Sequence, residues 1–143
     1  MAAEEIIKQE IAIVWFKRDL RFTDHEPLYF AQKQSLPVLL MYCFEPSVMN
    51  YVDSDVRHWR FVYQSLREMQ TKLSDLNSLL YVFHNEVITV FQKIAELYRI
   101  RTIFSHQEIG NKITYDRDLD IKKFCLLNGI EWKEFQHRGK FQD

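Results

Sequence analysis

Four short and nearly continuous apolar runs lie in the first three quarters of the chain. They cover residues 11–16, 37–44, 79–84 and 102–105. Runs of this length without polar alternation are typical of strands in a parallel sheet, because helices cover such strands on both faces. A fifth segment, 131–135, alternates polar and apolar residues, which predicts an edge strand with one wetter face.

The segments between these runs have helical periodicity. The clearest helix is predicted over 55–76, where apolar residues recur every three or four positions, with Ser54 as its N-cap. A shorter helix is predicted near Thr23 and Asp24, and another after Asn85. A fourth is predicted over 114–128, ending at a left-handed Gly129. The expected buried positions of these helices are Val56, Trp59, Val62, Leu66, Met69, Leu73, Leu76, Leu28, Ala31, Val87, Phe91, Ile94, Tyr98, Ile121, Phe124 and Cys125.

Strands and helices therefore alternate from one end of the chain to the other. Because crossovers between parallel strands are right-handed, this order predicts an α/β fold: an open, doubly wound, five-stranded parallel sheet with helices on both faces. No repeat or linker interrupts it, so residues 1–143 are expected to form a single domain.

Composition removes several functional classes. Glycine occurs at only 3 positions, so no glycine-rich dinucleotide fingerprint, Walker A loop or nucleophile elbow exists. The 2 cysteines form no disulfide framework, and Cys43 is expected to be a small buried hydrophobe. The formal charge of −1 gives no overall basic footprint for DNA. With neither a secretion signal nor a membrane-length apolar run, the chain is expected to be cytoplasmic and away from membranes.

In open α/β sheets, ligands bind beyond the carboxyl ends of the strands, where the strand order reverses. The sequence places charged, hydrogen-bonding and aromatic residues there: Lys17, Arg18, Asp19, Arg21, Cys43, Phe44, Glu45, His84, Asn85, His106, Gln107, Glu108, Gly110 and Asn111. The stretch 17–21 has two interpretations, an anion site or an ion-pair knot that fixes the loop. Glu108 is the best single ligand contact, with loop capping as the alternative.

Other residues near this edge favour structural roles. Arg117 and Asp118 are expected to be structural, pairing with the first loop. Trp15, Trp59 and Trp132 are expected in the core, although Trp15 lies close enough to the edge to touch a planar ligand. A metal site on His84 and His106 is not favoured, because no carboxylate or cysteine stands at ligand spacing in the sequence.

Two stretches resemble the DNA photolyase and cryptochrome family. IVWFKRDLRFTDHEPL (13–28) is similar to the family's first strand and turn, and SHQEIGNKITYDRD (105–118) is similar to a segment of some bacterial members. Between them, SDVRHWRF (54–61) resembles the family's long second helix. The similarity covers essentially the whole chain in the right order.

The resemblance implies an amino-terminal α/β domain that partners a larger helical domain. In the family, that helical domain holds FAD and contacts DNA, and the α/β domain often binds a light-harvesting pigment: a folate, a deazaflavin or a flavin. Photolyases split pyrimidine dimers with excited reduced flavin, and cryptochromes signal. This chain has no positions for the helical domain, so by itself it is expected to bind no DNA and to be catalytically inactive.

The resulting hypothesis is an antenna-pigment domain without catalytic residues of its own. Trp15 and Phe44 are expected to give planar contacts. The expected polar contacts are Lys17, Arg18, His106, Glu108 and Asn111. Three alternatives remain: a cryptochrome-type photoreceptor domain, a docking module with an empty cleft, and an adenine-nucleotide-binding α/β domain. The loop after the fourth strand is longer than in members whose glutamate grips the antenna pigment, so Glu108 departs from that pattern in its loop.

Overall fold

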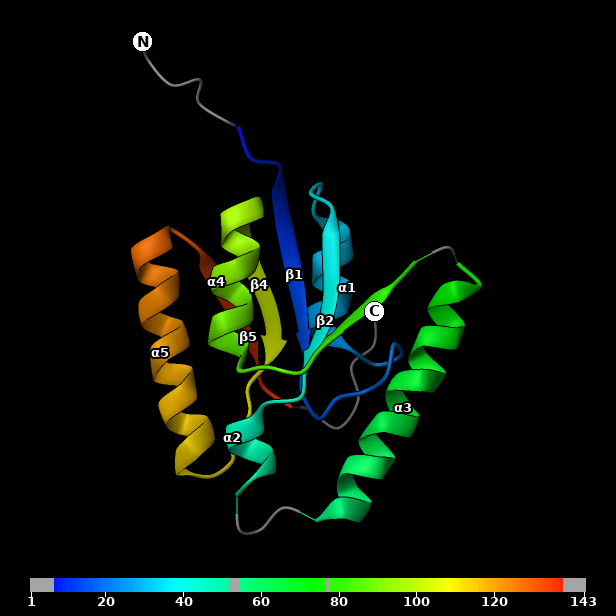
Figure 1. The fold of residues 1–143 in the computed structure, drawn as a ribbon. Coiled ribbons are helices and arrows are strands. Elements are labelled where there is room, and N and C mark those ends of the chain that lie inside the picture. The colour runs from blue at the N-terminus through cyan, green and yellow to red at the C-terminus, as the bar shows by residue number, and fades with distance from the viewer. Residues whose placement is uncertain (1–6, 52–54, 77, 138–143) are drawn as a thin grey trace.

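The computed structural model describes residues 7–51, 55–76 and 78–137. Within them, five strands alternate with helices in the order that the sequence predicts (Figure 1). The elements are β1 (Glu10–Phe16), α1 (Glu26–Lys33), β2 (Val38–Cys43), α2 (Pro46–Met49), α3 (Val56–Ser74), β3 (Leu80–Phe83), α4 (Val87–Leu97), β4 (Arg99–His106), α5 (Lys112–Asn128) and β5 (Glu131–Phe135).

The five strands form one parallel sheet in the order β3-β2-β1-β4-β5. The chain moves outward from β1 to β3 on one side, then crosses to β4 and moves outward to β5 on the other. The strand order therefore reverses between β1 and β4, and the loops at their carboxyl ends diverge there. The carboxyl edge is the lower edge of the sheet in Figure 1.

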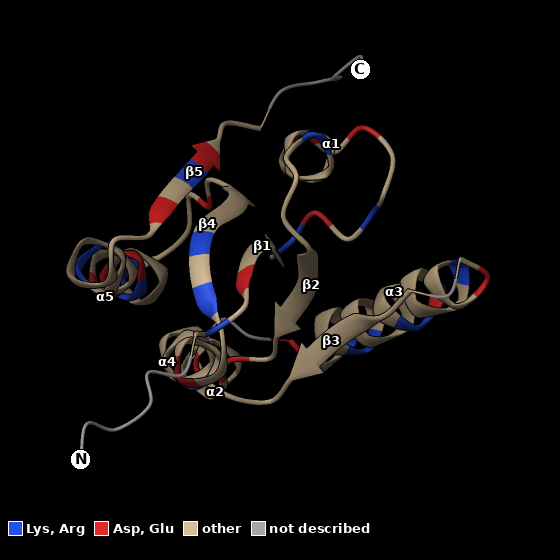
Figure 2. Cartoon of the chain, turned by 90° about the horizontal axis from the view of Figure 1, so that it is seen from above, with Lys and Arg blue, Asp and Glu red and all other residues tan. Residues whose placement is uncertain are grey.

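Helices cover both faces of the sheet, which confirms the doubly wound architecture. α4 and α5 pack over Ile13, Trp15 and Ile103, whereas α1 and α3 pack over Val14 and Phe16 on the other face. Successive β1 residues point to opposite faces, and residues 11–16 are buried on both. Figure 2 shows the sheet between these two pairs of helices.

Helix ends follow local capping chemistry. The N-cap of α3 is Asp55, whose carboxylate accepts a hydrogen bond from the Arg57 amide, while the predicted cap, Ser54, lies outside the described residues. α5 begins at Lys112, two residues before the predicted start, and its N-cap is Asn111. Gly129 ends α5 with φ 64°, the left-handed conformation that the sequence predicts.

Some boundaries differ from the prediction. The short helix α2 was not expected, and β4 begins at Arg99 rather than at residue 102. Leu76 and Tyr98 were expected on buried helix faces, but both follow the last residue of their helix and are exposed. Val56, in the first turn of α3, is also exposed. Beyond a helix end, the 3.6-residue period no longer determines which way a side chain points.

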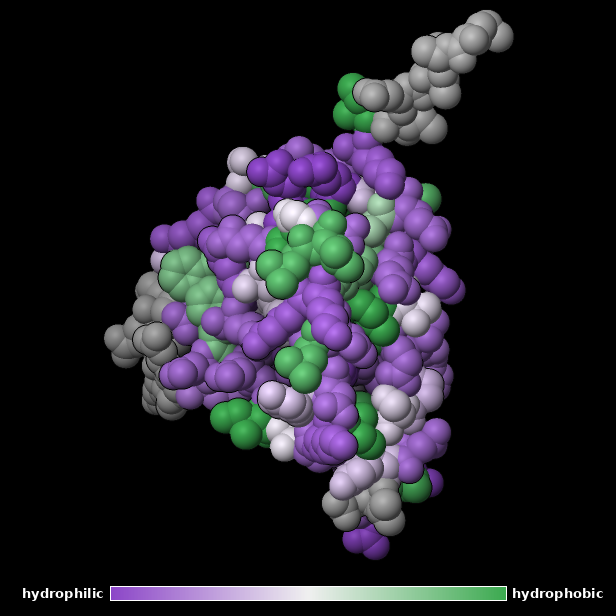
Figure 3. All heavy atoms as spheres, turned by 90° about the vertical axis from the view of Figure 1, so that its left-hand side faces the viewer, coloured by the Kyte–Doolittle hydropathy of each residue, from purple (hydrophilic) through white to green (hydrophobic). Residues whose placement is uncertain are grey.

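The outer surface on the α4–α5 side is mainly hydrophilic, with hydrophobic side chains in small separate groups (Figure 3). Within the part of the chain that the structure describes, no helix is both long and apolar enough to cross a membrane.

Candidate functional site

Arg117 is the centre of a buried ion-pair network at the carboxyl edge of the sheet. From α5, its Nη1 donates to Glu45 Oε1 at 2.8 Å, beyond β2, and its Nη2 donates to Glu108 Oε1 at 2.6 Å, beyond β4. Its Nε donates to Asp118 at 3.0 Å. Arg18, from the loop after β1, meets the second oxygen of Glu108 at 3.2 Å. Arg117 was therefore correctly predicted to be structural, but its carboxylate partners lie beyond β2 and β4, not in the first loop.

The two glutamates on Arg117 differ electrostatically. Burial raises the pKa of Glu45, and the opposing effects of Arg117 and of the Val87 amide do not cancel the rise. Burial acts on Glu108 in the same direction, but Arg117, Lys17 and Arg18 together hold its pKa below the ordinary value. Glu108 is thus the carboxylate that its surroundings keep ionised, with both oxygens already paired.

Lys17 lies above the indole of Trp15, with its Nζ 4.1 Å from the ring centroid, and Arg117 lies 4.9 Å from the same ring. Trp15 is 2% exposed, so a molecule entering from the edge meets these cations before it meets the indole. Lys17 itself is 8% exposed, and its ammonium has no hydrogen-bond partner among the described residues. Burial accordingly lowers the pKa of Lys17.

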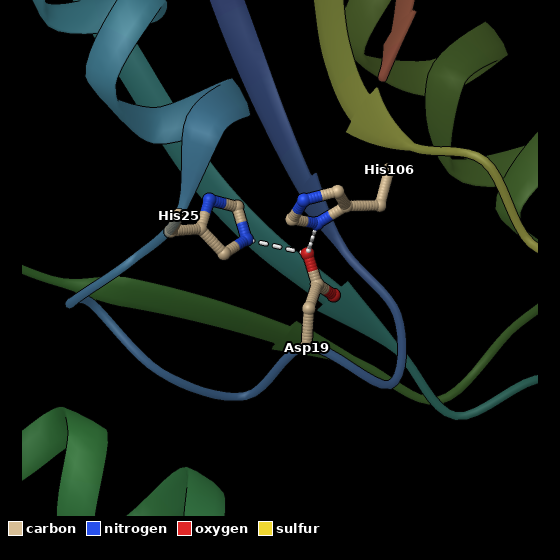
Figure 4. A group of neighbouring side chains, drawn as sticks. All are labelled: Asp19, His25 and His106. Atoms are coloured by element: carbon tan, nitrogen blue, oxygen red, sulfur yellow. Dashed lines mark hydrogen bonds and ion pairs between the residues drawn. The ribbon is translucent and has the colours of Figure 1, made fainter. Parts of the chain in front are cut away.

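Asp19 forms a second buried centre on the opposite face of the sheet end. One oxygen, Oδ2, contacts both His25 Nε2 and His106 Nδ1, the latter at 2.6 Å (Figure 4). The other oxygen accepts the Lys17 amide at 2.7 Å. Burial alone would raise the pKa of Asp19, but the hydrogen bonds from His106 and His25 hold it far below its ordinary value. Asp19 therefore ties the β1 loop to α1 and β4.

Asp19, His25 and His106 lie close enough together to suggest a metal site, although the sequence spacing argued against one. The fold supplies a carboxylate, Asp19, that is distant from His106 along the chain, so spacing in the sequence does not reveal it. His25, however, also caps α1, since its Nδ1 accepts the Leu28 amide at 3.1 Å. This bond assigns the ring hydrogen to Nε2, which donates it to Asp19. A metal on Nε2 would displace that hydrogen, so the arrangement fits hydrogen bonding better than coordination.

One cleft at this edge lies between α3 and the ends of β1 and β2, with a volume of about 560 Å³. We call it the α3-side cleft. Aromatic and apolar side chains form one part of the wall and the Arg117 network forms another. The lining of this cleft includes Trp15, Lys17, Arg18, Arg21, Tyr42, Glu45, Tyr51, Trp59, Phe61, Glu108, Asn111 and Arg117.

A second cleft, of about 440 Å³, lies between the β1 loop and the ends of β4 and β5. We call it the β5-side cleft. Its lining residues are Lys17, Arg18, Asp19, His106, Gln107, Glu108, Ile109, Gln136 and His137. The imidazole of His137 stacks on that of His106, with ring centroids 4.3 Å apart.

Most of the predicted contact residues meet at these two clefts. Trp15 and Asn111 line the α3-side cleft, His106 lines the β5-side cleft, and the remaining three, Lys17, Arg18 and Glu108, line both. Phe44 is the exception: it is buried behind the wall and packs against Tyr42 and Trp59. His84 is exposed, with its ring beside Phe44. Cys43 is buried and burial raises its pKa, as expected for an unreactive thiol.

His25 was not predicted as a site residue, and Trp59 was predicted only in the core. Trp59 is half-buried, lines the α3-side cleft, and has an indole N–H without a hydrogen-bond partner among the described residues. Its position at the first turns of α3, next to a strand end, was the available signal. For His25, only its place at a helix start indicated a capping role.

The family model described as DNA photolyase matches residues 12–140. The chain belongs to the DNA photolyase family. Its place in that family is the amino-terminal α/β domain of photolyases and cryptochromes.

Individual relatives agree with this placement. Cryptochrome DASH from a Synechocystis strain is 31% identical over 129 residues, covering 86% of this chain and 26% of that protein. The solved Synechocystis cryptochrome matches 93% of this chain and 28% of its own, with 26% identity and a TM-score of 0.81. The Sulfolobus tokodaii photolyase, described with two FAD molecules and a novel light-harvesting cofactor, matches 88% of this chain and 29% of its own, with 26% identity and a TM-score of 0.76. The chain thus spans about a quarter of the length of these photolyase-family relatives.

Proposed function

We propose that this photolyase-family domain binds a planar light-harvesting pigment in the α3-side cleft. The observation that carries the proposal is the cleft of about 560 Å³ at the strand-order reversal, which joins an aromatic wall to a fixed polar network. Ligand sites commonly combine a concave apolar surface with a few convergent polar groups, in volumes of about 300–1,000 Å³. The folate, deazaflavin and flavin pigments implied by the resemblance are planar molecules that suit such a site.

The role in a longer protein follows from this proposal. The pigment would absorb light and pass its energy to FAD in a helical domain, which would split pyrimidine dimers in a photolyase or signal in a cryptochrome. The Sulfolobus photolyase, which is described with two FAD molecules, supports a second pigment in this family. No bond chemistry is assigned to the side chains of this chain, and DNA would be contacted by the helical domain.

The test is a fluorescence titration of the purified chain with reduced folate, a deazaflavin, FMN and FAD, with ATP as the control ligand. We expect saturable binding of one pigment and no detectable binding of ATP. Arg18→Ala and Glu108→Gln should weaken that binding, whereas Glu96→Ala, on the exposed surface of α4, should not. Unchanged affinity in both cleft variants would overturn the site, and tight ATP binding would favour an adenine-nucleotide domain.

Exposed apolar side chains on edge strand β3 favour docking as a second candidate function. Tyr81 and Val82 are 44% and 46% exposed, and Leu79 just before the strand is 50% exposed. A helical domain packed there would cover them. Self-association of the isolated chain, reduced by Tyr81→Lys with Val82→Lys and combined with no pigment binding, would favour docking over the pigment role.

A further inference from the structure

Helix α5 has an exposed apolar stripe in addition to the face that it buries. The buried face packs inside the domain and comprises Thr114, Ile121 and Cys125. On a different side of the helix, Tyr115, Leu119 and Leu126 are 64%, 40% and 84% exposed. Lys122 stands between the last two, so the four residues follow one another at spacings of four, three and four and form one stripe, the α5 stripe. Exposed apolar side chains in one line indicate a contact surface, and the aliphatic stem of Lys122 can extend it.

A hollow adjoins the amino-terminal end of the α5 stripe. It has a volume of about 220 Å³ and lies between the loop after β4 and the first turns of α5. Ile109, Tyr115 and Leu119 contribute its apolar lining. At the other end of the stripe, Leu126 is followed by Leu127, which is 85% exposed. One end of α5 thus offers an apolar recess, and the other end offers apolar side chains that can fill one.

The spacings of the α5 stripe read the same in both directions along the helix. A second copy of α5 that runs antiparallel to the first therefore brings the partner's Leu126 opposite Tyr115, beside the hollow. The same register brings the partner's Lys122 opposite Leu119. Because a two-fold axis makes each contact occur twice, both hollows would be filled at once. The α5 stripe is thus complementary to itself.

The charges beside the stripe fit the same arrangement. Asp116 and Lys123 are both exposed, and each directly follows a stripe residue, so they lie along the same side of the stripe. In the antiparallel register, Asp116 comes within two residues, about 3 Å along the axis, of the partner's Lys123. Opposite charges then meet on both sides of the two-fold axis. A parallel pairing would place each charge at the level of the same charge in the partner, so the charges favour the antiparallel orientation.

We propose that α5 is a docking surface for a second copy of this chain, and that the two copies form a two-fold symmetric dimer through antiparallel α5 helices. α5 has 17 residues and is about 25 Å long. One helix pair of this length covers less than the about 1,200 Å² at which stable interfaces begin, so the dimer should be weak. α5 and α3 cover opposite faces of the sheet (Figure 1), so a partner on the α5 stripe and a pigment beside α3 would not compete for the same surface.

The test is sedimentation equilibrium of the purified chain over a series of concentrations up to the millimolar range. We expect a reversible equilibrium between monomer and dimer. Leu126→Asp should weaken the dimer at least about tenfold, because it places a charge where an apolar side chain enters the partner's hollow. Glu68→Lys, at an exposed position of α3, is the control and should leave the association constant unchanged.

Charge reversal tests the orientation of the two helices. Asp116→Lys and Lys123→Asp each bring like charges together at both ends of the antiparallel pair, so each single variant should associate several-fold more weakly than the original chain. An equimolar mixture of the two variants restores opposite charges at both ends and should associate more strongly than either variant alone. Both substitutions in one chain keep the formal charge at −1 and should restore the original association constant.

Three outcomes would contradict the dimer. A chain that stays monomeric at every concentration would overturn it. Association that persists in Leu126→Asp but is abolished by Tyr81→Lys with Val82→Lys would assign self-association to β3 and overturn the α5 surface. A double charge variant that associates no better than the single variants would overturn the antiparallel orientation. Pigment binding is measured separately by the fluorescence titration, so failure of the dimer and failure of the proposed function are distinguishable.

Discussion

Asp19 and Arg117 lie at the same edge of the sheet, but their charges are satisfied differently. Asp19 is a single carboxylate that accepts N–H groups from two histidines and one backbone amide. Arg117 is a single cation that faces three carboxylates. The first centre closes the β1 loop onto α1 and β4, whereas the second forms part of a cleft wall. Buried charge at this edge thus fixes a loop in one place and lines a cleft in the other.

The comparison predicts that Arg117 contributes more to stability than Asp19. Replacing Arg117 with Met leaves Glu45 buried without a cation and leaves Glu108 with only the exposed Arg18, which should cost about 3–5 kcal/mol in the free energy of unfolding. Urea denaturation measures the loss. Adding Glu45→Gln and Glu108→Gln to the same chain should restore part of it, and no recovery would mean that the network is not the cause.

Asp19→Asn should lower the free energy of unfolding by a smaller amount, about 2–3 kcal/mol. The amide nitrogen of asparagine would face the two histidine donors, so at least one buried N–H would lose its acceptor. Asp120→Asn, at an exposed position of α5, is the matched control and should stay within about 0.5 kcal/mol of the original chain. A loss equal to that of the control would show that the cluster does not support the loop.

The contribution of Asp19 to stability should depend on pH and should be lost in acid. Because the folded-state pKa of Asp19 lies below its ordinary value of 3.8, its contribution to stability is complete above that value. The contribution is lost as pH falls through the lower folded-state pKa. The stability gap between the original chain and Asp19→Asn, measured by urea denaturation from pH 7 to pH 2, should therefore be constant near neutrality and close in acid. A gap that widens in acid would contradict the assignment.

Compared with the Arg117 and Asp19 substitutions, Lys17→Met should change the free energy of unfolding least and the affinity for the pigment most. Burial lowers the pKa of Lys17. At neutral pH its charged ammonium is therefore less well solvated in the folded state than in the unfolded state, which lowers the free energy of unfolding. Removing it should leave stability unchanged or raise it by up to about 1 kcal/mol, and this gain should vanish above pH 10.5, where the lysine is neutral in both states. Pigment affinity should fall, and a large loss of stability would indicate a structural lysine.

The sequence predicted the sheet well because apolar runs and helical periods report burial directly. The order of strands and helices, the two covered faces and the stop at Gly129 were all confirmed. These features depend on neighbours along the chain, or on the handedness rules that connect them.

The edge chemistry was harder to predict because it depends on which loops meet in space. Arg117 pairs across 72 positions with Glu45, and His106 pairs across 87 with Asp19. Spacing in the sequence cannot rank such pairs, so Arg117 was assigned to the wrong loop. Trp59 illustrates the same limit, since one aromatic side chain belongs both to the core face of α3 and to the cleft wall.

The most direct test of the pigment site is a nuclear magnetic resonance titration of the three tryptophan indole N–H signals. The tightest-binding pigment should shift the signals of Trp15 and Trp59, which line the α3-side cleft, and Trp59 most strongly. Trp132 donates its indole N–H to Ser105 at 2.9 Å and lines neither of the two clefts, so its signal should move least. A titration that shifts Trp132 and leaves Trp59 in place would contradict the site.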